Sequence, residues 1–186
     1  MPERDRYWSL KSDATTPRDL LSQLAAGSRV LEVGCGTGLE SRSLAAEGFE
    51  VHAIDTDLGA IRLASERDTA PAGLFFAAQD FSTHQFQDEF DAVFERGVFH
   101  NIKSDADRDD FSEKVARALK PYGLWFNISG CADDHTRGRN HGCLYLSHIV
   151  PAVEPMFEIL SIERRPYGEI EAGYNFDAWF SVFRRR

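Results

Sequence analysis

The chain has few cysteines and no hydrophobic stretch long enough to cross a membrane. Its 186 residues include three cysteines, Cys35, Cys131 and Cys143, which cannot all pair within one chain. A reducing compartment is therefore the simpler expectation. No apolar run approaches the ~20 residues of a membrane span. The first residues, MPERDRYWSLKSD, lack the apolar core of a signal peptide. We therefore expect a cytoplasmic protein with no membrane partner.

The chain also lacks an excess of basic residues. It has 21 Lys and Arg against 30 Asp and Glu, a formal net charge of −9. Such a charge repels polyanions unless basic groups gather on one face. The only basic run, Arg184 to Arg186, is explained as well by a short solvated tail as by a phosphate contact. A nucleic-acid partner is therefore disfavoured.

The sequence shows no internal repeat, no low-complexity segment and no linker that would separate two cores. Hydrophobic residues make up 42% and charged residues 27%, as in an ordinary globular protein. The length suits one domain. We expect a single domain over residues 1–186, with an N-terminal arm and helix in 1–28 and a substrate lid in 131–145.

Apolar segments rich in β-branched and aromatic residues predict buried strands. Apolar residues at helical spacing, with capping residues before them, predict helices between several of these strands. The predicted strands are Arg29–Val33, Glu50–Ile54, Leu74–Ala78, Phe90–Phe94, Leu124–Ile128, Phe157–Ile162 and Phe176–Phe183. The predicted helices start at Thr16-Pro17, at Thr37 with capping-box spacing to Glu40, near Leu58, and at Asp105, the last ended by Pro121-Tyr122-Gly123.

This alternation predicts an α/β fold, a Rossmann-like doubly wound sheet with helices on both faces. The last two strands break the alternation. The stretch between them contains Pro166, Gly168 and Gly173 and has no helical periodicity. We therefore expect a hairpin that makes the sheet mixed, with the last strand antiparallel.

A glycine-rich turn follows the first strand, in VLEVGCGTG. Glycine lets a backbone approach a ligand closely, and ligands bind at the carboxyl ends of strands in such sheets. Asp55 ends the next strand, where a carboxylate can accept both hydroxyls of a ribose; alternatively, it caps the helix near Leu58. Asp80 follows the third strand and can accept from an adenine amine, while Phe81 packs on the ring; alone, Asp80 would more often be a loop acid.

Two common nucleotide-binding patterns are absent. The dinucleotide fingerprint GxGxxG needs a third glycine at position 39, which is Leu39 here. No Gly-Lys-Ser or Gly-Lys-Thr forms a Walker loop. The spacing found is GxGxG, with Glu32 two residues before its first glycine. A nucleoside with a zwitterionic tail fits this loop better than a pyrophosphate.

The segments VLEVGCGTG, VHAIDTD, AAQDF, FDAVFERGVFHNI and LKPYGLWFNISG occur in this order from Val30 to Gly130. In these segments the chain resembles the class I S-adenosylmethionine-dependent methyltransferases. The resemblance implies a seven-stranded sheet with a reversed last strand and S-adenosylmethionine as cofactor. It implies that the backbone of Gly34, Cys35 and Gly36 lines the methionine part, with Asp55 at the ribose, Asp80 and Phe81 at the adenine, and Glu95 and Arg96 beside the sulfonium. Trp8, Glu32 and Thr56 are further candidates for contact with the cofactor.

The resemblance also bears on the methyl acceptor. The Asn/Asp-Pro-Pro-Tyr/Phe motif of DNA amino-methyltransferases is absent after the fourth strand, and only one glutamate stands where arginine methyltransferases have two. FDAVFERGVFHNI looks more like the thiopurine and tellurite-resistance methyltransferases. We expect methyl transfer by in-line displacement to a small molecule with a sulfur, oxygen or nitrogen nucleophile. The alternative is a non-catalytic S-adenosylmethionine-binding regulatory or scaffold protein.

Several residues are candidates for contact with the acceptor. His100 follows the fourth strand and could accept a proton as the catalytic base; alternatively, it is a packed or solvated histidine. Tyr7 and Trp8 could fold over the site as a lid or form an ordinary surface pair. The hairpin loop near Tyr167 should also face the substrate.

The segment CADDHTRGRNHGC, from Cys131 to Cys143, contains four residues of metal-ligand type: Cys131, His135, His141 and Cys143. Their spacing matches no common zinc module, so we expect no metal. Its high polarity favours a substrate lid. In such a lid, Arg137 or Arg139 could hold a carboxylate or phosphate of the acceptor through paired donors.

Overall fold

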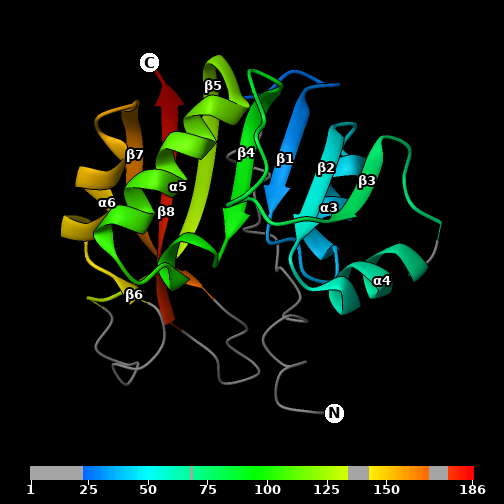
Figure 1. The fold of residues 1–186 in the computed structure, drawn as a ribbon, viewed down its shortest axis with the longest axis horizontal. Helices are drawn as coiled ribbons and strands as arrows, with labels where there is room; N and C mark the ends of the chain where they lie inside the picture. Colours follow the sequence, from blue (N-terminus) through cyan, green and yellow to red (C-terminus); the bar gives the residue numbers. More distant parts are fainter. Residues whose placement is uncertain (1–22, 68, 134–142, 168–175) are drawn as a thin grey trace.

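The computed structural model describes residues 23–67, 69–133, 143–167 and 176–186. Within them, the strands form one eight-stranded sheet (Figure 1). The strands are β1 Arg29–Val33, β2 Glu50–Asp55, β3 Leu74–Ala78, β4 Phe90–Arg96, β5 Leu119–Cys131, β6 Cys143–Leu144, β7 Phe157–Tyr167 and β8 Phe176–Arg185. The helices are α3 Leu39–Ala46, α4 Leu58–Glu66, α5 Asp105–Ala118 and α6 Leu146–Val153, with a 3₁₀ turn η1 at Phe99–Asn101.

The sheet order is β3-β2-β1-β4-β5-β8-β7, and the short β6 pairs beside β5. The first five strands of this order are mutually parallel. Strand β8 runs antiparallel to both of its neighbours. The arrowhead of β8 therefore points up in Figure 1 while those of β1 and β4 point down. The predicted mixed sheet with a reversed last strand is confirmed.

All seven predicted strands are present, and several are longer than predicted. Strand β4 continues through Glu95 and Arg96, and β5 runs on to Cys131. Polar residues end the apolar run that predicts each strand. Glu95 lies opposite Asn127 in the ladder, and the amide of Asn127 donates to the Glu95 carboxylate. The buried carboxylate of Glu95 on β4 thus has a hydrogen-bond donor on β5. The two strands can therefore continue beyond the apolar residues that predict them.

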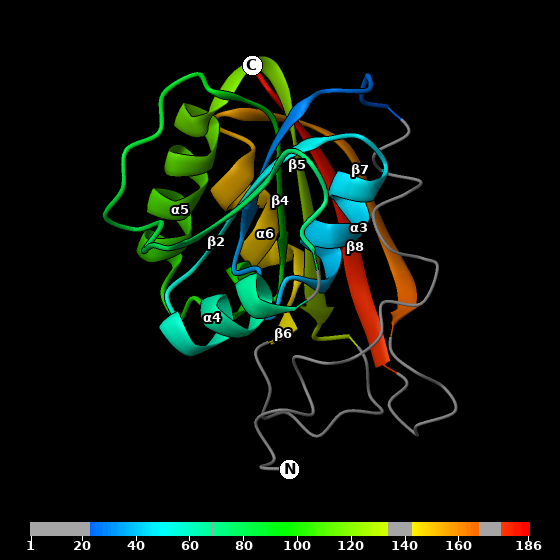
Figure 2. The ribbon, with the colours of Figure 1, turned by 90° about the vertical axis from the view of Figure 1, so that its right-hand side faces the viewer.

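Helices cover both faces of the sheet. Figure 2 shows α5 and α6 on one side and α3 on the other. One buried cluster, centred on Trp125, includes side chains of α5 and α6 such as Val115 and Ile149. The other includes Leu44 of α3 and Ile61 of α4. Successive residues of β5 alternate between the two clusters, as the two-residue period of a strand requires.

One predicted helix start and one alternative capping role need correction. Thr37 does not open a capping box: α3 begins at Leu39 after Gly38, whose φ of 74° is left-handed, and no side chain caps it. The Glu40 carboxylate is instead paired with Arg96. Helix α4 is capped by Asp57, which accepts from the backbone N–H groups of its first turn. The alternative role of Asp55 as the helix cap is therefore wrong.

Helix α5 begins at its cap Ser104 and ends at Ala118, earlier than predicted. The chain passes directly into β5, so Pro121-Tyr122-Gly123 lies within that strand and does not end the helix. The pairing of β5 with β4 shifts register in this part, and Tyr122 has a φ of 64°. Such a bulge accommodates a proline that a regular ladder would exclude.

Helix α6 was not predicted from the sequence. It contains Pro151, which argues against a helix interior. The spacing of Ile149, Ala152 and Val153, all buried, is the signal that could have identified it. None of the helices in the described ranges has the length and apolarity that crossing a membrane requires.

We expect Trp125→Ala to cost about 3–5 kcal/mol of the free energy of unfolding, because it leaves a cavity at the centre of one core cluster. Trp125 is fully buried, and its ring contacts those of Phe99, Phe111, Phe157 and Phe183. The control is Leu63→Ala on α4, where the side chain is 59% exposed and a change within about 0.5 kcal/mol is expected. Denaturant unfolding measures both, and equal losses would contradict this account of the core.

Candidate functional site

The loops that follow β1, β2, β3 and β4 lie at one edge of the sheet, because parallel strands end on the same side. Backbone hydrogen bonds tie these strand ends together. The N–H of Gln79, after β3, donates to the Asp55 carbonyl at 2.9 Å. The N–H of Gly97, after β4, donates to Ile128 of β5 at 3.1 Å. The sequence-predicted residues after these four strands therefore gather at one edge.

The glycine turn after β1 is fixed to the end of β2. The N–H groups of Gly34 and Cys35 donate to the Ile54 carbonyl at 2.8 and 3.0 Å. The N–H of Gly36 donates to Oδ2 of Asp55 at 2.8 Å. The other oxygen of Asp55 accepts from the N–H of Asp57, also at 2.8 Å. The half-buried Asp55 carboxylate therefore orients the loop, and each of its oxygens keeps a lone pair for a further donor.

Both the backbone conformation at position 34 and the neighbouring side chain require a glycine there. Its φ is +75°, and a Cβ placed there would come within 2.3 Å of Cγ2 of Val98. Val98 follows β4, so this contact brings the β4 turn against the glycine turn. The sequence analysis missed Val98, because an apolar side chain in a loop carries no chemical signal by itself.

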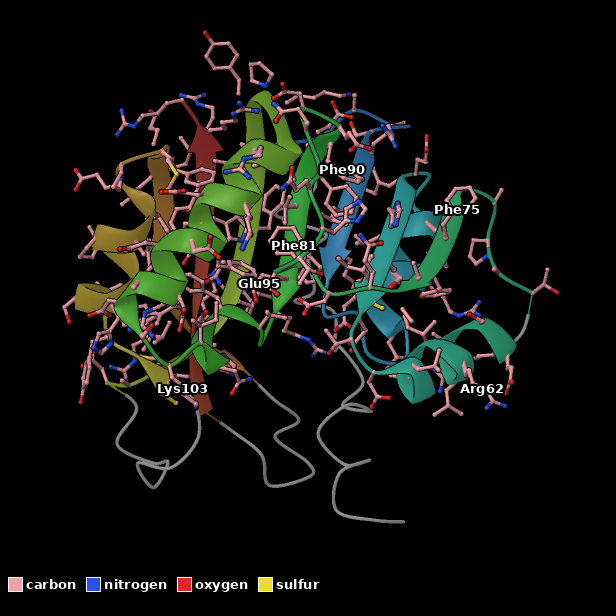
Figure 3. All side chains as sticks on the ribbon, viewed as in Figure 1. Arg62, Phe75, Phe81, Phe90, Glu95 and Lys103 are labelled. Carbon is pink, nitrogen blue, oxygen red and sulfur yellow. The ribbon has the colours of Figure 1, made fainter. Side chains whose placement is uncertain are left out.

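The residues predicted to contact the cofactor after β2 and β3 differ in how exposed their side chains are. Asp80 is exposed, and its Oδ1 accepts from the N–H of Ser82 at 2.8 Å. Thr56 is also exposed. Phe81, labelled in Figure 3, is only 5% exposed, and its ring packs on those of Phe86 and Phe111 within the core. Because that ring is already enclosed by protein, Phe81 can offer a ligand its backbone more readily than its ring.

Beneath the glycine turn lies a buried acidic network that joins β1, α3 and β4. Glu32 is 3% exposed and accepts from the hydroxyl of Ser41. Glu40 is paired with Arg96, Nη2 to Oε1, at 2.6 Å. Burial, and then the nearby Glu40 carboxylate, raise the pKa of Glu32 to about 8. Glu32 is therefore mostly protonated at neutral pH, and the ion pair leaves the network close to neutral.

Glu95 is enclosed at the end of β4. It is fully buried and accepts from the N–H groups of Val98 and Phe99 at 2.9 and 3.1 Å. The amide of Asn127 donates to its other oxygen. Burial raises the pKa of Glu95 to about 7, although these three donors act in the opposite direction. The Glu95 side chain therefore holds the turn after β4 through its hydrogen bonds to the backbone of that turn. The sequence analysis missed Asn127, and its only signal is an amide inside an apolar strand.

His100 lies in η1 and is half-buried. Its Nδ1 accepts from the backbone N–H of Gly130, near the end of β5, at 2.9 Å. The histidine predicted as a catalytic base is thus held between the ends of β4 and β5.

The three cysteines are free thiols. Cys35 is buried, and burial raises the pKa of its thiol, which disfavours the nucleophilic thiolate form. Cys143 is the neighbour of Gly130 in the ladder, and Leu144 is the neighbour of Cys131. Cys131 and Cys143 therefore face opposite sides of the sheet. No group of three metal-ligand side chains occurs among the residues described, a set that leaves out His135 and His141.

Some sequence-predicted site residues lie outside the described residues. These are Tyr7 and Trp8, Arg137 and Arg139, and the predicted N-terminal helix from Thr16. Tyr167 is the last residue of β7, and the structure describes its backbone without its side chain.

Residues 30–123, about half of the chain, match the family model described as "Methyltransferase domain". The ubiquinone biosynthesis O-methyltransferase of Caulobacter vibrioides is 34% identical over 104 residues, which cover 54% of this chain and 40% of that protein. The chain spans less than half the length of the curated relatives it matches.

Two solved structures share the fold. A SAM-dependent methyltransferase of Methanosarcina mazei is 20% identical, with a TM-score of 0.75 over 90% of this chain and 97% of that one. A TehB-like SAM-dependent methyltransferase of Corynebacterium glutamicum is 18% identical, with a TM-score of 0.69 over 90% of this chain and 85% of that one. At such identities the likeness concerns the fold alone.

We expect Glu32→Gln to flatten the pH dependence of stability. The pKa of Glu32 is raised in the folded protein from an ordinary 4.5 to about 8. Its contribution to stability is therefore complete below pH 4.5 and is lost as the pH rises through 8. Glutamine does not ionise and can still accept from Ser41, so the variant lacks this part of the loss.

Denaturant unfolding between pH 5 and pH 9 measures the difference between the two proteins. The matched control is Glu113→Gln, at an exposed position of α5, whose profile should follow that of the wild type. If Glu32→Gln also follows the wild type, the Glu32 carboxyl is not held protonated by its burial.

Proposed function

Because the chain belongs to the methyltransferase domain family, we propose that it transfers a methyl group from S-adenosylmethionine to a small molecule with a sulfur, oxygen or nitrogen nucleophile. The observation that carries this proposal is the Asp55 carboxylate, bonded to the glycine turn through the N–H of Gly36. It places an acceptor of hydrogen bonds and a closely approachable backbone at the edge where such folds bind ligands.

The residues present fit an adenosyl group with a charged tail. Asp55 keeps acceptor capacity on both oxygens, which suits the two hydroxyls of a ribose. Asp80 is exposed after the neighbouring strand, with one oxygen used by Ser82. The positive φ angles of Gly34 and Gly36 give a turn without side chains that would keep a ligand away from the backbone.

The surroundings suit a cationic donor. S-adenosylmethionine supplies an electrophilic methyl group on a positively charged sulfur. An unpaired arginine would repel that charge, but Arg96 is neutralised by Glu40. Glu95 fixes the turn after β4 through Val98 and Phe99, so this wall is already ordered before a ligand binds. Alignment of the reacting groups in a closed site is the main requirement for such a displacement.

The acceptor class rests on three further observations. The segment FDAVFERGVFHNI resembles that of the thiopurine and tellurite-resistance methyltransferases, and one solved structure with a similar fold is named TehB-like. The matched Caulobacter protein is an O-methyltransferase of ubiquinone biosynthesis. These observations support a compact metabolite as acceptor and leave its nucleophilic atom to experiment.

We expect Asp55→Ala to weaken S-adenosylmethionine binding at least tenfold, because a charge-assisted acceptor of hydrogen bonds contributes about 1.5–3 kcal/mol. Calorimetric titration measures the affinity. The matched control is Asp57→Ala, which removes the cap of α4. The control should cost about 1 kcal/mol of stability and leave the affinity within about threefold. Equal affinity of Asp55→Ala and the wild type would refute the proposed site.

Transfer of a labelled methyl group separates an enzyme from a non-catalytic binding protein. The wild type is incubated with labelled donor and a panel of thiols, phenols and amines. We expect label on at least one acceptor class, and its loss in Asp55→Ala at subsaturating donor. A protein that binds the donor with high affinity and labels nothing in the panel would instead support the regulatory or scaffold alternative.

A further inference from the structure

Val98, in the turn after β4, contacts the glycine turn after β1. A Cβ built on Gly34 would lie 2.3 Å from Cγ2 and 3.8 Å from Cβ of Val98. Cγ2 is therefore within about 4 Å of the Gly34 Cα, which is a van der Waals contact. Among the described residues, and apart from the neighbours of Gly34 in the chain, only these two atoms lie within 4 Å of that Cβ position. Val98 thus meets the glycine turn directly.

The protein holds Val98 in place through both its backbone and its side chain. Its N–H donates to Oε2 of Glu95 at 2.9 Å, and its carbonyl accepts from the N–H of Asn101 at 3.0 Å. Its half-buried side chain packs against the core cluster that contains Trp125. The Glu95 carboxylate in turn accepts from the amide of Asn127 on β5. The side chain that meets Gly34 is therefore held from both β4 and β5.

The glycine turn is bonded to β2 on its other side. The N–H of Gly34 donates to the Ile54 carbonyl, and that of Gly36 donates to the Asp55 carboxylate. Both glycines have positive φ angles, and a chain of glycines has many other conformations available. The bonds to β2 hold the turn from one side, and the contact with Val98 opposes its movement toward β4. The glycine turn is therefore positioned between β2 and Val98.

The sheet order places this contact between two parts of the proposed site. Strand β1 lies between β2 and β4, and the arrowheads of β1 and β4 point to the same edge in Figure 1. Under the proposed function, the donor contacts Asp55 and Asp80 follow β2 and β3, so the ends of β4 and β5 remain for the acceptor. An in-line displacement requires close alignment of donor and acceptor. The spacing between the glycine turn and the β4 turn therefore bears on the reaction rate.

We propose that Val98 is a positioning residue for methyl transfer: its side chain sets the distance between the glycine turn, which holds the donor, and the β4 turn, which faces the acceptor. This inference rests on the proposed function and names a further residue of the same site. Val98 acts through Gly34 and not through contact with the reacting atoms. Its removal therefore slows the transfer step more than it weakens donor binding, which Asp55 still supports.

We expect Val98→Ala to lower kcat at least tenfold with an acceptor that the wild type methylates, because a misplacement of about 1 Å can cost a hundredfold in rate. Its affinity for S-adenosylmethionine, measured by calorimetric titration, should stay within about threefold of the wild type. Val98→Thr keeps an atom at both γ positions, so its kcat should stay within about threefold, although the hydroxyl lowers stability. An unchanged kcat in Val98→Ala, or equal losses in both variants, would overturn the proposal.

Val51→Ala is the control for lost stability. Val51 is fully buried and pairs with Val30 and Leu74 near the start of its strand, at the edge of the sheet opposite the two turns. Denaturant unfolding should show at least as large a loss of stability as in Val98→Ala, whereas kcat should stay within about twofold of the wild type. If kcat falls equally in the two variants, lost stability explains both and the proposal fails.

A double variant moves a methyl group from residue 98 to residue 34. In Gly34→Ala alone, the new Cβ would stand 2.3 Å from Cγ2 of Val98, so the two turns are forced apart. In Gly34→Ala with Val98→Ala that atom is absent, and the two Cβ positions are 3.8 Å apart, an ordinary contact. The double variant should therefore have a higher kcat than Gly34→Ala, with a loss at least tenfold smaller than the product of the single losses. Single losses that simply multiply would overturn the proposal, because independent sites behave in that way.

Hydrogen exchange of the ligand-free protein gives a readout that does not depend on turnover. Val98→Ala should raise the exchange of the backbone N–H groups of residues 34–38 several-fold over the wild type, and the double variant should reverse part of this rise. Val51→Ala should leave exchange in this turn closer to that of the wild type. An active wild type with unchanged exchange in Val98→Ala overturns this proposal alone. A wild type that methylates no acceptor overturns the proposed function, and this proposal with it.

Discussion

The arrangement of the candidate site depends on the Asp55 carboxylate, which bonds the turn after β1 to the end of β2. One oxygen accepts from the N–H of Gly36 and the other from the N–H of Asp57. A loop with glycines at 34, 36 and 38 would otherwise have many accessible backbone conformations. These hydrogen bonds restrict the loop, and the same carboxylate is the group that we propose to bind a ribose. Under this proposal, one side chain both orders the loop and recognises the ligand.

The turn after β4, on the other side of the candidate site from Asp55, is held by a second carboxylate, that of Glu95. Glu95 is fully buried, and protein donors occupy its oxygens. It therefore holds the turn after β4 rather than facing solvent. Asp55, which is half-buried, holds the loop and is the group that we propose to bind a ligand. Asp55 lies at the end of β2 and Glu95 near the end of β4, the two strands that flank β1. Because Glu95 is buried and Asp55 is half-buried, only Asp55 can also meet a ligand.

The acidic network near the proposed site for a cation is kept close to neutral. It consists of Glu32, Glu40 and Arg96. A buried pair of carboxylates is costly unless one is protonated or a cation neutralises it. Here Arg96 pairs with Glu40, and the pKa of Glu32 is raised to about 8. The network lies under the glycine turn and joins α3 to β1 and β4, so the electrostatic balance of the site is linked to the stability of the fold.

The sequence alone determined the sheet class, the seven principal strands, the reversed last strand and the importance of the glycine turn, because apolar periodicity and glycine spacing are local signals. Only the tertiary structure decided which acid caps α4, where α3 begins, and that Phe81 packs in the core. It also decided the partners of Asn127, Val98 and the Nδ1 of His100. These depend on contacts between residues distant in the chain, such as His100 with Gly130, and the identity of a residue does not reveal which backbone N–H the fold will bring to it.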